Sequence, residues 1–317
     1  MASWARTNLS GHSRASGNPG RHVPARVAAL GPRFRGDERW RRLACAALTV
    51  LLVAASSAQA QAPRRIASFN VCADQLVVAL ADPGQIVGLS PYAGDPAIST
   101  IADKARDFPR LPLQAEALVP LDPDLVLVGT WDRPLTQRLL RTLGMRVVGV
   151  DVVSDLDAAR AQIRRLAALL GHPGRGEALI AGIDAAQRRL QAAPRPASSS
   201  ALLIGNGGYT VGPDSLASAL MAEAGLTPPA GAPAGYGGFV PLEKLIVLKP
   251  DYLVMASLIE RADGQGALFL THPALRALYP PQRRIVLPSR FTLCAGPSLI
   301  AAFDYLTKVV MRLAAHP

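Results

Sequence analysis

Short apolar segments alternate with longer amphipathic ones along most of the chain. The short segments are rich in β-branched residues, as buried parallel strands are, and predict strands at 64–69, 86–90, 123–129, 145–152, 201–206, 251–257 and 283–289. Helical periodicity between them predicts helices at 72–82, 133–144, 154–171, 215–225 and 297–314. This alternation is typical of an α/β fold with mainly parallel sheets.

The longest helical pattern lies in the middle of the chain, at 174–194. Leu179, Ile183, Ala186 and Leu190 follow one another at intervals of four, three and four, so one face of the helix can be buried. Such a helix is about 30 Å long. We expect it to join two α/β lobes, with an N-terminal lobe at 61–153, a helical segment at 154–194 and a C-terminal lobe at 195–317.

One sequence pattern occurs twice, 127 residues apart. EALVPLDPDLVLV at 116–128 and EKLIVLKPDYLVM at 243–255 both begin with a Glu, reach Pro-Asp seven residues later and continue into an apolar strand. The repeat indicates two lobes of similar construction.

The N-terminus has the features of a secretory signal peptide. Residues 39–60 have a basic start, an apolar core from Leu43 to Ala55, and Ala58-Gln59-Ala60 as a small-residue cleavage site. Residues 1–38, upstream of it, show no periodicity and predict a non-structural extension. We therefore expect cleavage near Ala60 and export from the cytoplasm.

The leader carries most of the net charge of +11. Its removal takes away nine Arg together with Asp37 and Glu38, which leaves 25 basic and 21 acidic residues, a net charge of about +4. No basic segment with interleaved aromatics remains, so nucleic acid is not an expected partner. No later segment has the roughly 20 uninterrupted apolar residues of a spanning helix, so we expect a soluble exported protein. We also expect it to be a monomer.

On these features the chain resembles the periplasmic substrate-binding proteins of the cobalamin, haem and ferric-siderophore ABC importers. The resemblance is carried by RIASFNVCADQLVVALADPGQIVGLSPYAGDP at 65–96, by the repeated segment and by the long helix. It implies a class III binding-protein architecture in the periplasm, with two Rossmann-like lobes joined by one long helix and a metal chelate held between them as cargo. A ferric siderophore or cobalamin is the expected chelate, ahead of haem, because no His falls near the expected cleft. No cofactor is expected.

The resemblance also gives the repeated Glu a role. In the family, one exposed Glu on each lobe pairs with Arg residues of the two permease subunits, and Glu116 and Glu243 match those positions. A simpler alternative is that each carboxylate only complements the dipole of the helix it begins.

Ligands of α/β proteins meet the loops at the carboxyl ends of the strands. This rule predicts a ligand site from Asn70, Cys72, Tyr92 and Trp131 in the first lobe, and from Asn206, Tyr209, Tyr236, Phe239, Ser257, Arg290 and Phe291 in the second. Aromatic rings suit a flat macrocycle or a catecholate, and an Arg neutralises a carboxylate, phosphate or propionate. Tyr92 and Trp131 also lie where family members often place aromatic ligand contacts.

Cys72 and Cys294 both fall near the expected region between the lobes. Three alternatives stay open: two small buried thiols, a disulfide that staples the lobes, or a thiolate that ligates haem iron or cobalt.

Other classes of site find little support. IGNGGYTVG at 204–212 lacks the third glycine of a dinucleotide motif and indicates a backbone bend, and His172, His272 and His316 do not make a bare-metal site. No GxSxG, CxxC or HExxH motif is present, so an enzyme is not expected. The alternatives kept are an exported α/β hydrolase using Asp95 or Asp214, and a two-lobed periplasmic sensor.

Overall fold

The computed structural model describes residues 62–196, 199–256 and 269–315. The predicted extension (1–38) and signal peptide (39–60) lie outside these residues, as do Ser257 and His316. Within the described part of the chain, no helix combines the length and apolarity that crossing a membrane requires.

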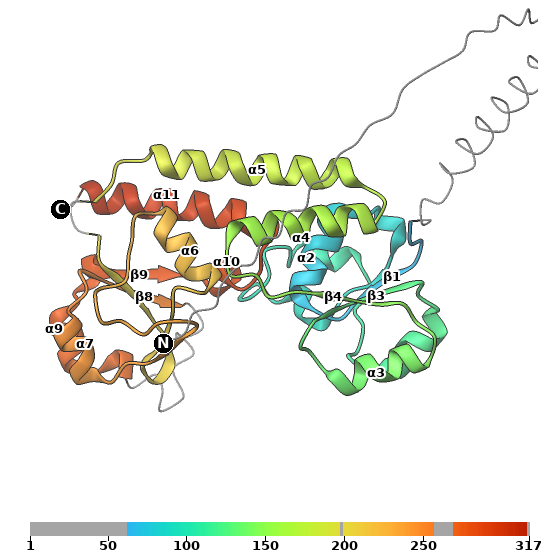
Figure 1. Ribbon diagram of the computed structural model, residues 1–317, viewed down its shortest axis with the longest axis horizontal. Helices are drawn as coiled ribbons and strands as arrows, with labels where there is room; N and C mark the ends of the chain where they lie inside the picture. Colours follow the sequence, from blue (N-terminus) through green and yellow to red (C-terminus); the bar gives the residue numbers. More distant parts are fainter. Residues whose placement is uncertain (1–61, 197–198, 257–268, 316–317) are drawn as a thin grey trace, which may run out of the picture. The chain divides into compact units, whose positions relative to one another are not determined.

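The N-terminal lobe is built on a four-stranded, fully parallel sheet in the order β2-β1-β3-β4 (Figure 1). Its strands are β1 (Ile66–Ser68), β2 (Ile86–Gly88), β3 (Leu125–Gly129) and β4 (Val147–Val150). The helices of this lobe are α2 (Val71–Leu80) and α3 (Pro134–Thr142), with 3₁₀ turns η1 (Pro83–Gln85), η2 (Pro91–Gly94), η3 (Lys104–Asp107) and η4 (Ala115–Leu121). Gly144, at φ 80°, follows the last turn of α3, where a left-handed residue ends the helix as predicted.

The C-terminal lobe contains a mixed five-stranded sheet in the order β7-β6-β5-β8-β9. Its strands are β5 (Ala201–Ile204), β6 (Tyr209–Val211), β7 (Gly237–Phe239), β8 (Tyr252–Ala256) and β9 (Arg284–Leu287). The helices are α6 (Leu216–Glu223), α7 (Leu242–Leu248), α9 (Pro273–Leu278), α10 (Ser289–Thr292) and α11 (Ser298–Ala315), with 3₁₀ turns η5 (Asn206–Gly208) and η7 (Pro281–Arg283). Strands β5, β8 and β9 are parallel, as expected, and β6 and β7 add an antiparallel edge that the hydrophobic pattern did not predict.

The glycine-rich segment at 204–212 makes the turn between β5 and β6. Gly207 and Gly208 have φ values of 68° and 84°, which other residues rarely adopt. A Cβ on Gly208 would lie 2.5 Å from the Val240 carbonyl oxygen. The predicted backbone bend is therefore confirmed, and it takes the form of a hairpin turn.

Two consecutive helices, α4 (Leu156–Leu169) and α5 (Pro173–Ala192), connect the two sheets. The cap of α4 is Asp155, whose carboxylate accepts the Ala158 N–H at 2.7 Å. Asp155 takes the cap because its own carboxylate reaches the first free N–H groups of the helix. Helix α5 is the long helix predicted from the apolar spacing.

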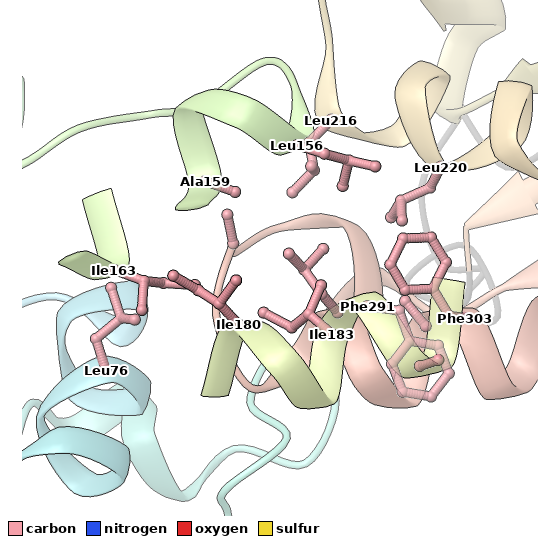
Figure 2. Close-up of a cluster of buried hydrophobic side chains, with 14 of the residues drawn as sticks. Leu76, Leu156, Ala159, Ile163, Ile180, Ile183, Leu216, Leu220, Phe291 and Phe303 are labelled. Carbon is pink, nitrogen blue, oxygen red and sulfur yellow. The ribbon is translucent and has the colours of Figure 1, made fainter. Parts of the chain in front are cut away.

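Helix α5 packs along both α4 and α11 (Figure 1). One continuous core joins these helices to strands of both sheets, including Ile66 and Leu125 of the first and Val254 and Ile285 of the second. Figure 2 shows the centre of this core, with Ile180 and Ile183 of α5 among side chains from α2, α4, α6, α10 and α11. Because core side chains are packed at crystal-like density, this arrangement opposes large lobe movements. The predicted α/β class, with two lobes on one long helix, is confirmed.

The structure explains the Pro-Asp part of the repeat. The Asp124 carboxylate accepts the N–H groups of Arg64 and Arg65 at 2.7 and 3.0 Å, just before β1. The Asp251 carboxylate accepts the N–H and hydroxyl of Ser200 at 3.1 and 2.8 Å, just before β5. In each lobe the Asp thus fixes the start of two neighbouring parallel strands. The preceding residues, Asp122 and Lys249, both adopt left-handed backbone with φ near 40°.

Candidate functional site

The first candidate residues lie at the carboxyl ends of β1 and β3. The Asn70 amide oxygen caps α2 by accepting the Cys72 and Ala73 N–H groups at 2.8 and 3.2 Å. Its Nδ2 donates to the Asp132 carboxylate at 2.6 Å, which links the loop after β1 to the loop after β3. Gly129 permits this contact, because a Cβ there would lie 2.2 Å from the Asp132 carboxylate.

Hydrogen bonds from the Gln137 side chain hold the loop that carries Trp131. This buried amide donates to the carbonyls of Gly129, Thr130 and Asp132 at 3.0, 3.3 and 2.6 Å. Trp131 itself is 83 % exposed. A large aromatic surface on a hydrogen-bonded loop is available to a ligand at little cost in conformational freedom. The sequence analysis did not select Gln137. Its only signal in the sequence is that a polar residue falls on the apolar face of the predicted helix.

Three depressions meet around these loops and share lining residues. The first, of about 600 Å³, includes Thr130, Trp131, Arg138 and Arg141. The second, of about 330 Å³, contains Asn70, Tyr92, Asp132 and Arg133. The third is a crevice of about 60 Å³ lined by Asn70, Cys72, Trp131 and Asp132 from the first lobe and by Leu293, Cys294 and Ala295 from the second. The structure therefore places Asn70 with Trp131 in the crevice and with Tyr92 in the second depression, and the crevice lies between the lobes.

Cys72 and Cys294 form a disulfide with an S–S distance of 2.08 Å. Of the three alternatives for these cysteines, the structure has the staple, which ties the first turn of α2 to the segment before α11. A disulfide sulfur carries no thiolate, so neither cysteine is a metal ligand in this state.

Arg290 and Phe291, predicted together, have different positions. The Arg290 guanidinium lies 5.0 Å from the centre of the Phe291 ring and donates to the Pro96 carbonyl in the other lobe at 3.2 Å. Phe291 is only 7 % exposed and packs in the core against Tyr305, 5.4 Å between ring centres. The expectation that Phe291 contacts the ligand is therefore corrected, because the turn that exposes Arg290 directs the next side chain inward.

The other C-terminal candidates gather on the antiparallel edge of the second sheet. Tyr209 and Phe239 pack edge to face with ring centres 5.5 Å apart, and the Tyr209 hydroxyl donates to the Tyr236 carbonyl at 3.4 Å. All three rings and Asn206 are exposed. The structure thus makes one exposed aromatic cluster of residues spaced 30 positions apart in the sequence.

Asp74 is a buried carboxylate that the sequence analysis did not select. It is fully buried and accepts the Ser90 N–H at 3.1 Å and the Ser90 hydroxyl at 2.5 Å. Burial raises the pKa of Asp74 to about 6, and hydrogen bonds from Ser68 and Ser90 oppose that rise. Because Ser90 immediately precedes the turn that carries Tyr92, Asp74 positions one wall of the second depression.

The described histidines have local roles. His172 lies at the start of α5 with its Nε2 3.0 Å from the Gln85 side-chain oxygen and 3.3 Å from the Asp82 carboxylate. His272 Nδ1 accepts the Ala274 N–H at 3.2 Å. Among the described residues, no three His, Cys, Asp or Glu side chains gather in a way that could hold a metal ion. Asp95, one carboxylate of the hydrolase alternative, accepts the Ala97 N–H of its own turn at 2.9 Å.

Glu116 and Glu243 occupy equivalent places in η4 and α7, each in the first turn. Both are exposed, and within the described part of the chain neither makes an ion pair or a side-chain hydrogen bond. Unlike the Asp residues of the repeat, these two carboxylates have no partner among the residues that the structure describes.

Comparison with known proteins places this geometry in a family. Residues 66–279 match the family described as "Periplasmic binding protein". A periplasmic haem-binding protein from Pseudomonas aeruginosa is 25 % identical, with 78 % of this chain and 93 % of that chain covered and a TM-score of 0.61. The periplasmic haem-binding protein BhuT, solved with two haems, is 25 % identical over 80 % of this chain and 99 % of that chain, also at 0.61.

The vitamin B12-binding protein BtuF of Vibrio cholerae is more distant in sequence. It is 15 % identical, with 80 % of this chain and 99 % of that chain covered and a TM-score of 0.59, which shows a shared fold. A search of curated proteins found no match.

Proposed function

The chain belongs to the periplasmic binding protein family, and on this premise we propose that it captures a metal chelate between its lobes and delivers it to an inner-membrane permease. The family acts outside the cytoplasm, and cleavage near Ala60 would release this member into the periplasm. The observation that carries the proposal is the family match over residues 66–279, together with exposed aromatic rings at the carboxyl ends of the strands.

The exposed rings suit a large, partly apolar cargo. Trp131 and Tyr92 come from the first lobe, and Tyr209, Tyr236 and Phe239 from the second. Aromatic faces stack on macrocycles and catecholates, and Asn70, Asn206 and Arg290 add polar and cationic groups for the periphery of the ligand. Capture by such a surface requires no catalytic step.

Haem is the first chelate to test. The sequence argument ranked it behind siderophores and cobalamin because no His lies near the cleft, but a tyrosine phenolate also binds haem iron. Tyr92 is partly exposed in the same depression as Arg133. Two structural relatives at 25 % identity are haem-binding proteins, which further favours haem.

A titration of the protein beginning at Gln61 tests the substrate class. Trp131 is then the sole Trp of the chain, since Trp4 and Trp40 leave with the leader. Haemin, cobalamin and Fe(III) complexes of a hydroxamate and a catecholate siderophore are added in turn, with Trp131 emission and calorimetry as readouts. Saturable quenching with a submicromolar Kd for haemin alone supports haem. Calorimetric binding of another member of the panel replaces haem with that chelate, and no binding by any of them overturns the proposal.

The role of Tyr92 is tested separately. Tyr92→Phe should remove the phenolate-to-iron absorption band of the haemin complex, whereas Tyr236→Phe, the matched control at another exposed tyrosine, should retain it. If both variants keep the band, Tyr92 is not the iron ligand, although haem capture itself would stand.

Docking to the permease is the role we propose for Glu116 and Glu243. They hold the same position in the repeated segment of each lobe, which fits a partner with two equivalent subunits that each offer a cation. The double change to Gln should abolish chelate uptake by the importer and leave chelate affinity unchanged. Glu177→Gln on α5 is the control, because this exposed Glu is paired with Arg164 and belongs to neither repeat. A loss of chelate affinity in the double variant would contradict docking.

A further inference from the structure

We propose that the two docking patches do different work: the N-terminal patch attracts the permease by charge, and the C-terminal patch holds it by apolar contact. This inference rests on the proposed docking function. The N-terminal patch is defined as Glu116, Val119, Pro120 and Asp122, and the C-terminal patch as Glu243, Lys244, Ile246, Val247 and Lys249.

Both patches follow the same helical register. The residue before each Glu and the residue two after it point inward: Ala115 and Leu118 are buried in one lobe, and Leu242 and Leu245 are half-buried and buried in the other. The residues three and four after each Glu face solvent. These are Val119 and Pro120 in η4, and Ile246 and Val247 in α7.

The outward apolar residues have no role in the core. Val119 is 55 % exposed and Val247 is 83 % exposed, although the adjacent Leu118 and the nearby Leu245 already fill the inward positions. Single exposed apolar residues are common on protein surfaces. Apolar residues at the same two outward positions of a repeated segment, beside the same carboxylate, instead indicate a surface that a partner covers.

The two patches differ in charge. In the N-terminal patch, Asp122 adds a second negative charge to that of Glu116. The equivalent of Asp122 in the C-terminal patch is Lys249, and Lys244 also follows Glu243. The residues of the first patch therefore sum to a formal charge of −2 and those of the second to +1. The exposed Arg65 guanidinium donates to the Leu121 and Asp122 carbonyls beside the first patch and brings its local charge to −1, still opposite in sign to the second. A permease that presents a cation to each patch is attracted over a distance mainly by the first.

The two patches also differ in apolar area. The C-terminal patch offers Ile246 and the more exposed Val247, whereas the N-terminal patch offers Val119 and a proline ring. Desolvation of apolar area is insensitive to moderate salt, whereas attraction between exposed charges is screened within about 8 Å at physiological ionic strength. Long-range charge mainly sets the association rate, and short-range contact sets the dissociation rate.

The test measures association and dissociation of the protein with its cognate permease–ATPase complex in nanodiscs, between 50 and 500 mM NaCl. Glu116→Gln with Asp122→Asn should lower the association rate about tenfold at low salt and flatten its salt dependence. Asn tolerates the left-handed backbone at position 122, so this change preserves the local fold. Val247→Ser should raise the dissociation rate about tenfold and leave the salt dependence unchanged.

Two controls match these changes. Glu177→Gln removes an exposed carboxylate of α5, and Met311→Ser removes an exposed apolar side chain of α11; neither should alter either rate. Two results would overturn the proposal of unequal roles even if docking is retained. One is the same dependence of the association rate on NaCl for the variants of both patches, and the other is an unchanged dissociation rate for Val247→Ser. If unaltered protein does not bind the complex at all, the proposed docking function itself fails.

Discussion

Replacement of Asp74 by Asn tests whether a buried carboxylate makes the stability of this protein depend on pH. Asp74 is fully buried in α2, its hydrogen-bond donors are Ser68 and Ser90, and no cation pairs with it among the described residues. Asn has nearly the same shape and keeps an acceptor oxygen for Ser90. The substitution therefore removes the titration with little change in packing.

The magnitude follows from the pKa, which rises from 3.8 to about 6 through burial. Each pKa unit corresponds to about 1.4 kcal/mol, so ionisation of Asp74 costs the native state about 3 kcal/mol. Between these two pKa values the native state binds more protons than the unfolded state. The protonated Asp74 therefore contributes to the free energy of unfolding in full below pH 3.8, and this contribution is lost as the pH rises through about 6.

Urea unfolding of the two proteins from pH 4 to pH 7.5 is the assay. The difference in unfolding free energy between the variant and the unaltered protein should shift by about 2.4 kcal/mol in favour of the variant over this range, most of it below pH 7. Asp304→Asn is the control: this carboxylate is partly exposed and paired with Arg189 rather than buried without a cation, so the difference should be flat here. A flat difference for Asp74→Asn would refute the reasoning.

Three further changes probe the architecture. Ile183→Ala, in the core shared by both sheets, should cost about 2–5 kcal/mol and keep one unfolding transition by fluorescence and circular dichroism; two separate transitions would show that the lobes unfold independently. Replacing Cys72 and Cys294 together by Ser should lower the unfolding free energy by about 5 kcal/mol in the chain-entropy model, because the bridge spans 222 residues, and an unchanged urea midpoint would contradict this. Asp251→Ala leaves the Ser200 N–H without its carboxylate acceptor and should cost about 1–3 kcal/mol by the same assay, whereas a neutral result would show that water replaces the bond.

Local patterns in the sequence predicted the parallel strands and the long helix, since periodicity reports directly on which face of an element is buried. The antiparallel edge escaped this method. Strands β6 and β7 have three residues each, and β7 begins with two glycines, so neither shows a hydrophobic period. The resemblance to periplasmic substrate-binding proteins, which rested on motifs in both lobes and on the long helix, is confirmed by the family match over residues 66–279.

The candidate site was predicted less completely. The rule that ligands contact the loops at the carboxyl ends of strands selected Asn70, Tyr92 and Trp131, which line adjoining depressions in the structure. The same logic selected Phe291 and missed Gln137. Both outcomes depend on side-chain direction, which the position of a residue after a strand does not determine.

The sequence by itself determined the class of fold, the duplication of a Glu-to-Pro-Asp segment and the family. Each of these can be recognised from the spacing of apolar residues and motif residues along short stretches of the chain. The tertiary structure alone decided which Asp residues hold the start of a strand, that Cys72 bonds Cys294 and that Asp74 is buried with no cation beside it among the described residues. These properties arise where segments far apart in sequence meet, with 222 positions between the two cysteines. Whether a residue is buried and which residue it bonds depend on these long-range contacts, and no local sequence pattern encodes them.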